Sequence, residues 1–466
     1  MINRFWNLTL QYSVGFLCLR AVSFLLLPLY TNLLTTKEAG FIFIIYTILA
    51  FLNTLYSFGM DSSLLKFYHL SKPKTVISTS LFYSLLICAP FSFLLLLVGS
   101  FFFSFLPPVD VFFTSNISLI FVVILFCDMI SSRIMQIVRL LEKPYYFLFV
   151  GLMNVFVSLF CNFYFIKELH LGLSGAVLSL VCVSLLQLFC LMPIVFSNFR
   201  LQLIDSRLFV KMLKFSLPFV PAALFFMLIE MSDRWMIAWL SSVENVGLYG
   251  AGYKIGGFML LLVRGFNLNW QPYYLKQDAG SCLKKFNLIG STFIVVMIFF
   301  SVLLSVFWPV LFNIKIGSLY FVGVDFWEGG VIIPIICVAY VFYGIFILQM
   351  PSIYLKNKEG WVVVFWGVGV FVNFILNYFM IPVYGFLGAA IGTLFAYLMM
   401  ALLLIYKNRF WLPIKYDYKK IFSFLLLSLG FYASFLLFTN SFLIFCFLIF
   451  TYFSISLFYL YKIQKS

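Results

Sequence analysis

The chain alternates long runs of apolar residues with short polar or charged stretches. A helix needs about 20 mostly apolar residues to cross a bilayer, and on that basis the pattern predicts fourteen spans. They cover residues 9–34, 41–60, 76–106, 112–133, 145–166, 172–196, 215–240, 246–270, 286–313, 329–351, 361–381, 385–406, 421–438 and 441–461. Twelve spans remain the alternative, because the hairpins at 382–385 and 439–441 are very short.

Composition supports an all-α polytopic membrane protein. Hydrophobic residues make up 64% of the 466 residues and charged residues 10%, against roughly 45–50% and 25% in soluble proteins. These values exclude soluble, disordered, collagen-like and disulfide-rich classes, and β-barrel strands would alternate polar with apolar residues. Arg20 interrupts the first apolar run and no small-residue cleavage site follows, so we expect a retained span there and not a signal peptide.

Basic residues are distributed unevenly between the two sets of loops. Of the 30 Lys and Arg, 23 fall in loops on the N-terminal side of the membrane, and the opposite side has only Lys37, Lys167 and Lys315. Excess Lys and Arg mark cytoplasmic loops, so we expect a multi-pass protein of the bacterial cytoplasmic (inner) membrane with both termini in the cytoplasm. The net charge of +15 then reflects topology and attraction to anionic lipid, and no nucleic-acid partner is expected.

The two halves of the chain resemble each other. Residues 35–40 recur as 242–247, an offset of 207, and residues 172–176 recur as 385–389. The offset spans six predicted helices, an even number, so both halves keep the same orientation. Two parallel six-helix lobes around a central cavity are a transporter architecture; chance similarity between apolar helices is the alternative. We expect an N-lobe (1–196), a cytoplasmic linker (197–214) with Asp205 capping a short surface helix, a C-lobe (215–406) and a C-terminal helix pair (407–466).

Seven charged residues fall inside the predicted spans, where an unpaired or unhydrated charge costs a few kcal/mol or more. They are Arg20, Asp128, Glu230, Asp233, Arg234, Lys254 and Arg264. The spacing puts Glu230, Asp233 and Arg234 on one helix face. We expect Asp233 or Glu230 to pair with Lys254, and Arg20 with Asp128. One interpretation is that the basic residues bind an anionic group in a cavity. The alternatives are that all seven residues form ion pairs that only stabilise the fold, and that Arg264 extends to the membrane interface.

Candidate bending points are Pro28 in the first span, Pro221 in the seventh, and Gly256 and Gly257 in the eighth. No Walker motif, nucleophile elbow, zinc motif or paired-carboxylate arrangement occurs, so we expect a protein without enzymatic activity, cofactor or metal. An enzyme remains the alternative only if the short outer loop 313–328, with Asp325 and Glu328, is catalytic.

Three stretches resemble oligosaccharide flippases of the polysaccharide transporter family, within the multidrug/oligosaccharidyl-lipid/polysaccharide (MOP) superfamily. They are PLYTNLLTTKEAG (28–40) with FGMDSSLLKFY (58–68); LKFSLPFVP (213–221) with SDR (232–234), VGLY (246–249), Tyr253-Lys254 and WQP (270–272); and NFILN (373–377) with IPVYG (381–385) and GAAIG (388–392). Each motif is loose, but their order and spacing make the match specific.

The resemblance implies two six-helix bundles around a cavity, here with two extra C-terminal helices. It also implies transfer of undecaprenyl-diphosphate-linked oligosaccharide units, for O-antigen, capsule or exopolysaccharide synthesis, to the outer leaflet by alternating access. Arg20, Asp233, Arg234 and Lys254 correspond to its cavity charges, and Arg264 is added on its depth. H⁺ or Na⁺ coupling and contact with a polysaccharide polymerase stay open, as do two alternatives: a lipid II flippase for peptidoglycan and an ion-coupled multidrug exporter.

Overall fold

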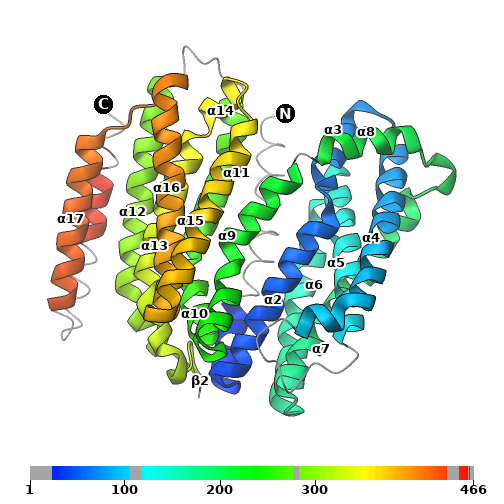
Figure 1. The fold of residues 1–466 in the computed structure, drawn as a ribbon, viewed down its shortest axis with the longest axis horizontal. Coiled ribbons are helices and arrows are strands. Elements are labelled where there is room, and N and C mark those ends of the chain that lie inside the picture. Colours follow the sequence, from blue (N-terminus) through cyan, green and yellow to red (C-terminus); the bar gives the residue numbers. More distant parts are fainter. Residues whose placement is uncertain are drawn as a thin grey trace. The chain divides into compact units, whose positions relative to one another are not determined.

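The computed structural model describes residues 24–104, 117–217, 219–275, 283–317, 319–437, 451–459 and 461. In these ranges nine helices are long and apolar enough to cross a membrane, and two bent helix pairs raise the number to 11. The strands are β1 (Lys315–Ile316) and β2 (Leu319–Tyr320), which pair antiparallel. The predicted all-helical membrane fold is therefore confirmed (Figure 1). The hairpin predicted at 439–441 lies outside the described residues.

Contacts divide the chain into two compact units. Unit 1 comprises Met1–Gly247 and Gly323–Asp325, and unit 2 comprises Leu248–Val322 and Phe326–Ser466. Unit 1 extends beyond the predicted N-lobe because α9 packs against α2, and the predicted lobe boundaries stay a prediction.

Unit 1 contains helix Phe24–Leu33 and the elements from α2 to the first turn of α10. These are α2 (Thr36–Ser57), α3 (Met60–Leu70), α4 (Pro73–Ser104), α5 (Ile117–Leu140), α6 (Pro144–Asn162), the π-helix η1 (Phe163–Glu168), α7 (Gly172–Asn198), the 3₁₀ turn η2 (Leu201–Leu203), α8 (Ser206–Ser216), α9 (Phe219–Leu240) and the first turn of α10 (Val243–Gly256). Helix α7 packs on α5 and α6, and α4 on α5.

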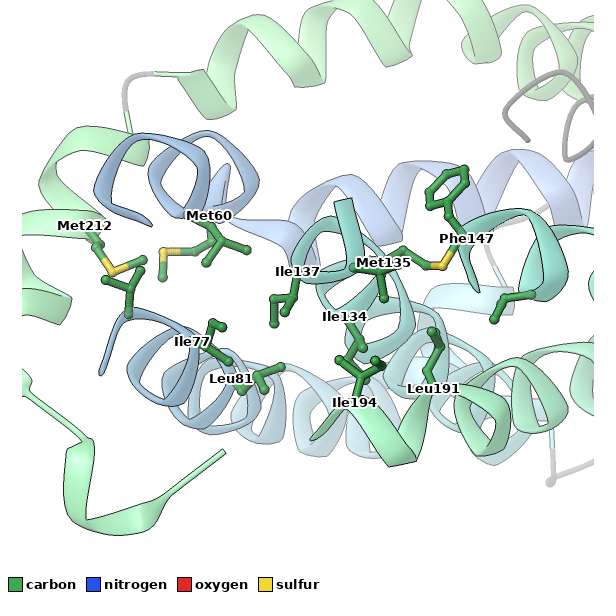
Figure 2. Close-up of a cluster of buried hydrophobic side chains, with 14 of the residues drawn as sticks. Met60, Ile77, Leu81, Ile134, Met135, Ile137, Phe147, Leu191, Ile194 and Met212 are labelled. Atoms are coloured by element: carbon green, nitrogen blue, oxygen red, sulfur yellow. The ribbon is translucent and has the colours of Figure 1, made fainter. Parts of the chain in front are cut away.

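The short helices α3 and α8 pack on each other and on α4, and α3 also packs on α5. Met60 of α3, Met212 of α8, Ile77 of α4 and Ile137 of α5 belong to one buried apolar cluster, drawn in Figure 2. The sequence did not predict α3, because its mixed polar and apolar residues do not form an apolar run. The predicted linker helix is confirmed as α8.

The N-cap of α8 and the N-cap of α17 (Tyr418–Leu437) are built in the same way. In unit 1 the N–H of Asp205 donates to Thr79 Oγ1 in α4 (3.0 Å), while the Asp205 carboxylate accepts from N–H groups in the first turn of α8. In unit 2 the N–H of Asp417 donates to Ser291 Oγ (2.9 Å), and its carboxylate accepts from the N–H of Lys420 (3.2 Å). In each unit the segment before the capped helix is therefore hydrogen-bonded to an earlier helix, and its Asp caps the helix that follows.

Asp417 also forms an ion pair with Lys420 Nζ (3.0 Å). Burial raises the pKa of the Asp417 carboxyl, but the hydrogen bonds from Lys420 and the charges of Lys420 and Lys419 outweigh it, so the pKa lies below its usual value. The ionised carboxylate is the form that caps α17.

Unit 2 is formed by the remaining helices. They are the rest of α10, α11 (Phe258–Leu275), α12 (Leu283–Asn313), the 3₁₀ segment η3 (Val324–Ile332), α13 (Ile333–Gln349), α14 (Pro351–Leu355), α15 (Gly360–Tyr384), α16 (Phe386–Trp411) and α17, with Gly323–Asp325 assigned to unit 1. Helix α16 packs on α15 and α13, and α12 packs on α13 and α17. The tight hairpin predicted between the eleventh and twelfth spans is confirmed, with Gly385 at φ 56° between α15 and α16.

One predicted span is bent, and another meets the linker helix before it at an angle. Helices α10 and α11 meet at an angle of 43° around Gly257, so the single span predicted at 246–270 is broken where the sequence has its Gly-Gly pair. Ser206–Ser216 and Val220–Leu240 meet at 48°.

Arg133 is the last residue of the predicted span 112–133 and one of the 23 basic residues assigned above to the cytoplasmic side, but α5 continues to Leu140 and buries this side chain completely. Its Nη1 forms an ion pair with Asp61 Oδ1 (2.5 Å) and its Nη2 donates to the carbonyl of Ser57 (3.1 Å). The pair joins α5 to the start of α3. The expectation failed because the apolar run ends before the helix does, and the partner that neutralises Arg133 lies 72 residues away.

We predict that Asp61→Asn lowers the melting temperature of the purified protein in detergent. The substitution leaves the Arg133 guanidinium buried without a counter-charge, at a cost of about 1–3 kcal/mol or more. Asp325→Asn, at an exposed position, is the matched control and should leave the melting temperature unchanged. Equal melting temperatures for all three proteins would contradict a stabilising role of this pair.

Candidate functional site

Helix α9 carries three charged side chains that are almost completely buried. Glu230 is 3% exposed, Asp233 0% and Arg234 8%. The Arg234 guanidinium donates from Nη1 to the backbone carbonyl of Glu230 (2.9 Å), one helical turn earlier. Helical spacing puts all three on one face, as expected. Three charges on one buried face of a membrane helix cost free energy unless they are paired, hydrogen-bonded or hydrated.

The adjacent face of α9 holds the helix against α2. Thr47 Oγ1 lies 3.9 Å from Met231 Sδ, and the rings of Phe51 and Trp235 meet edge to face with centroids 5.7 Å apart. Helix α2 thus fixes the orientation of the charged face of α9 within unit 1.

Asp128 in α5 is bound by neutral donors from two other helices. Asn53 Nδ2 of α2 donates to its Oδ2 (3.2 Å), and Ser184 Oγ of α7 donates to its Oδ1 (2.6 Å). The carboxylate therefore ties three helices of unit 1 together. Arg20, its expected partner, lies outside the described residues, so that pair stays a prediction.

In each unit two tyrosine hydroxyls meet inside the protein. In unit 1 the Tyr30 hydroxyl lies 2.8 Å from the Tyr46 hydroxyl and donates to Asn162 Oδ1 (2.8 Å). In unit 2 the hydroxyls of Tyr253 and Tyr340 lie 2.7 Å apart. Tyr46 and Tyr253 are separated by the repeat offset of 207, whereas their partners Tyr30 and Tyr340 are not, so only one member of each pair follows the internal repeat.

A second buried polar group in unit 2 joins α15 to α16. Asn377 Nδ2 donates to Asn373 Oδ1 (3.1 Å), and Asn373 Nδ2 donates to Thr393 Oγ1 (3.4 Å). In the described ranges no group of three or more His, Cys, Asp or Glu side chains is placed to hold a metal ion.

The remaining predicted site residues are spread over both units. Lys254 lies half-buried near the end of α10, and Arg264 lies half-buried in α11. Gly256 and Gly257 stand at the bend between these helices, and a Cβ at Gly256 would come within 2.8 Å of the Ile336 side chain. Pro28 lies within helix Phe24–Leu33, and Pro221 is exposed in the first turn of α9. Pairing of Asp233 or Glu230 with Lys254 stays a prediction.

Sequence reasoning identified the charged residues but missed the neutral ones that surround them. Asn53, Ser184, Tyr30 and Tyr340 are common residue types, and each meets a partner on another helix. The only signal in the sequence was the repeat offset that relates Tyr46 to Tyr253.

Comparison with known proteins agrees with this arrangement. The fold matches that of the lipid II flippase MurJ in an inward closed conformation, with 15% sequence identity, 97% of each chain covered and a TM-score of 0.73. It also matches an inward-facing multidrug resistance MATE family transporter of the MOP superfamily (12% identity, 84% and 94% covered, TM-score 0.62) and a variant of the Vibrio cholerae MATE transporter VcmN (13%, 87% and 95%, 0.59). The chain thus has the fold of MOP-superfamily transporters.

Residues 5–274 match the sequence model of a family described as polysaccharide biosynthesis protein. Because this match covers more than half of the chain, the protein belongs to that family, and the resemblance found in the sequence is confirmed. No curated protein matched the chain in a sequence search.

We predict that Ser184→Ala destabilises the protein by about 1–3 kcal/mol, because it removes a hydrogen bond to a charged group. The same substitution should cost much less in an Asp128→Leu background, where that acceptor is absent. Thermal unfolding of the two single variants and the double variant measures the difference. Ser197→Ala on the same helix, whose hydroxyl bonds only to the Pro193 carbonyl, is the control. Additive losses at 184 and 128 would contradict the contact.

Proposed function

We propose that this protein is a flippase that moves undecaprenyl-diphosphate-linked oligosaccharide repeat units from the cytoplasmic to the outer leaflet of the bacterial inner membrane. The products would serve synthesis of a surface polysaccharide such as O-antigen, capsule or exopolysaccharide. The observation that carries the proposal is the buried charged face of α9, in a chain that belongs to a polysaccharide biosynthesis family and has a transporter fold.

The diphosphate group is the natural ligand of the basic side chains. Arg and Lys form strong charge-assisted hydrogen bonds with phosphate oxygens, and a low-dielectric surrounding strengthens them. We assign this role to Arg234, Lys254 and Arg264, together with Arg20 from the family resemblance. The polyprenyl tail can stay in the lipid while the headgroup crosses through the protein.

The acidic residues suit a coupling role. Glu230 and Asp233 neighbour the proposed diphosphate ligand Arg234, and Asp128 is held by neutral donors. Each can take up H⁺ or Na⁺ and so alter the charge that meets the diphosphate. Gly256 and Gly257, at the bend between α10 and α11, with Pro28 and Pro221, are the proposed bending points of an alternating-access cycle. A polysaccharide polymerase is the proposed partner that receives the flipped units.

Cells that lack the protein should accumulate the lipid-linked oligosaccharide on the cytoplasmic leaflet, as shown by leaflet-specific labelling. Wild type should relieve the accumulation, whereas Arg234→Ala or Lys254→Ala should not, because the diphosphate loses a cationic ligand. Lys356→Ala, at an exposed position, should restore export fully. Normal outer-leaflet display in the deleted cells would refute the proposal.

If Asp233 pairs with Lys254, substituting both with neutral residues should impair export less than either single change, because each single change leaves a charge without its partner. Export rates of Asp233→Asn, Lys254→Gln and the double variant, at matched protein levels, measure this coupling. Multiplicative losses would show that the two residues act separately.

The second candidate is a lipid II flippase, and the observation that favours it is the coverage of 97% of the MurJ chain. Both functions use a polyprenyl diphosphate, so the two candidates differ in the headgroup that is moved. Proteoliposomes that contain the protein should transfer a lipid-linked oligosaccharide faster than lipid II. Faster transfer of lipid II would favour the second candidate. Export of amphipathic cations with neither lipid moved would favour a multidrug exporter.

A further inference from the structure

The second half of α5 presents a row of polar side chains on one side of the helix. Ser132 and Arg139 are exposed, and Asp128 and Gln136 are half-buried. Successive spacings of four, four and three residues put these four side chains on one face, which we call the polar face of α5. The other side of the same stretch packs into the apolar cluster of unit 1 (Figure 2).

The neighbouring helices α6 and α7 expose large apolar side chains instead. Phe156 and Phe160 of α6 are 65% and 57% exposed, and Phe189 and Phe196 of α7 are 78% and 70% exposed. Such surfaces suit lipid, whereas polar side chains that face hydrocarbon cost free energy and usually face a water-filled space. The polar face of α5 therefore meets water within the span.

The polar face runs from the middle of the membrane to one end of the span. Helix α5 rises about 16 Å between Asp128 and Arg139, about half of a hydrocarbon core of about 30 Å. The predicted orientation puts the end of α5, at Leu140, on the cytoplasmic side. Arg139 is then at the depth of the phosphate groups of the inner leaflet, and Asp128 is near the middle of the bilayer.

Two contacts to buried charges fix the rotation of α5. Asn53 of α2 donates to Asp128 Oδ2 (3.2 Å), and Arg133 forms its ion pair with Asp61 of α3. Turning the polar face away from water would break both contacts. The exposure of Ser132, Gln136 and Arg139 is thus part of the packing of unit 1.

The side chains at the end of the polar face are arranged to bind oxygen atoms. Arg139 Nη1 donates to Gln136 Oε1 (3.2 Å), which orients the guanidinium. A guanidinium has five N–H donors, so this bond is compatible with a bidentate contact to phosphate. One turn deeper, Ser132 Oγ donates to the Met129 carbonyl (2.9 Å), and its oxygen can accept a hydrogen bond from a sugar hydroxyl.

We propose that the polar face of α5 is the loading site of the transporter. Arg139, oriented by Gln136, binds the diphosphate of the lipid-linked oligosaccharide in the cytoplasmic leaflet, and Ser132 hydrogen-bonds the sugar next to it. This inference rests on the proposed flippase function. The cation lies at the depth of the lipid diphosphate before transfer, uncharged polar groups follow, and the inner end is Asp128, for which a coupling role is proposed above.

The first test asks whether the polar face meets water, without any transport. Purified Ser132→Cys and Gln136→Cys proteins in nanodiscs should react with a charged methanethiosulfonate at least tenfold faster than Phe156→Cys, because the reagent does not enter lipid. Phe156 is the matched control, since it is exposed on a lipid face. The wild-type protein gives the background from native cysteines. Equal rates at positions 132 and 156 would overturn the proposal.

The second test asks whether the substrate binds there. Undecaprenyl-diphosphate-linked N-acetylglucosamine in the nanodisc should slow labelling of Ser132→Cys severalfold, and undecaprenyl monophosphate should slow it much less. Adding Arg139→Gln should remove the protection, because the diphosphate loses its cationic ligand. Lys74→Gln, at an exposed basic position in the first turn of α4, is the matched control and should keep it. Labelling that neither lipid slows would refute the loading site.

Transfer in proteoliposomes separates this inference from the proposed function. Arg139→Gln should raise severalfold the concentration of lipid-linked sugar that gives half-maximal transfer, whereas Lys74→Gln should not. If the wild type transfers the lipid and Arg139→Gln transfers it equally well at every concentration, the loading site is refuted and the function stands. If the wild type transfers nothing, the proposed function fails, and the protection measured in nanodiscs still decides whether the polar face binds the diphosphate.

Discussion

A charged or polar group inside a membrane protein must find a partner within the protein, because the lipid offers none, and this constraint explains most of what the structure contains. Arg133 is completely buried and meets Asp61 and the Ser57 carbonyl. Asp128 takes its donors from two other helices. The three charges of α9 share one buried face. The first case joins α5 to α3, the second joins three helices, and the face of α9 is the proposed site for an anionic ligand.

The internal repeat gives the fold a second constraint, because equivalent elements are joined by equivalent contacts. The N–H of Asp205 donates to α4 and that of Asp417 donates to α12, and each carboxylate caps the helix that follows. At the start of α2 and α10 the repeats meet each other through glycine.

Much of the fold could be predicted from the length of the apolar runs. They located the helices that are long enough to cross a membrane, and the hairpin at Gly385. Helix α3, the bend at Gly257 and the burial of Arg133 could not, because run length records neither amphipathic helices nor changes of direction nor distant ion partners. In the candidate site, Glu230, Asp233 and Arg234 were predictable because charge is rare in such helices. Asn53, Ser184 and Tyr30 were not, since neutral polar residues gain their roles only through partners on other helices.

The central claim is that this chain alone moves a polyprenyl-diphosphate-linked oligosaccharide across a bilayer. The most direct measurement uses purified protein in proteoliposomes that carry such a lipid with a cleavable sugar label, and follows with time the labelled fraction exposed on the far leaflet. The account predicts transfer that depends on the protein and is competed by free polyprenyl diphosphate but not by polyprenyl monophosphate of the same tail length. Transfer no faster than in protein-free liposomes, in vesicles where the protein is folded and correctly inserted, would contradict it.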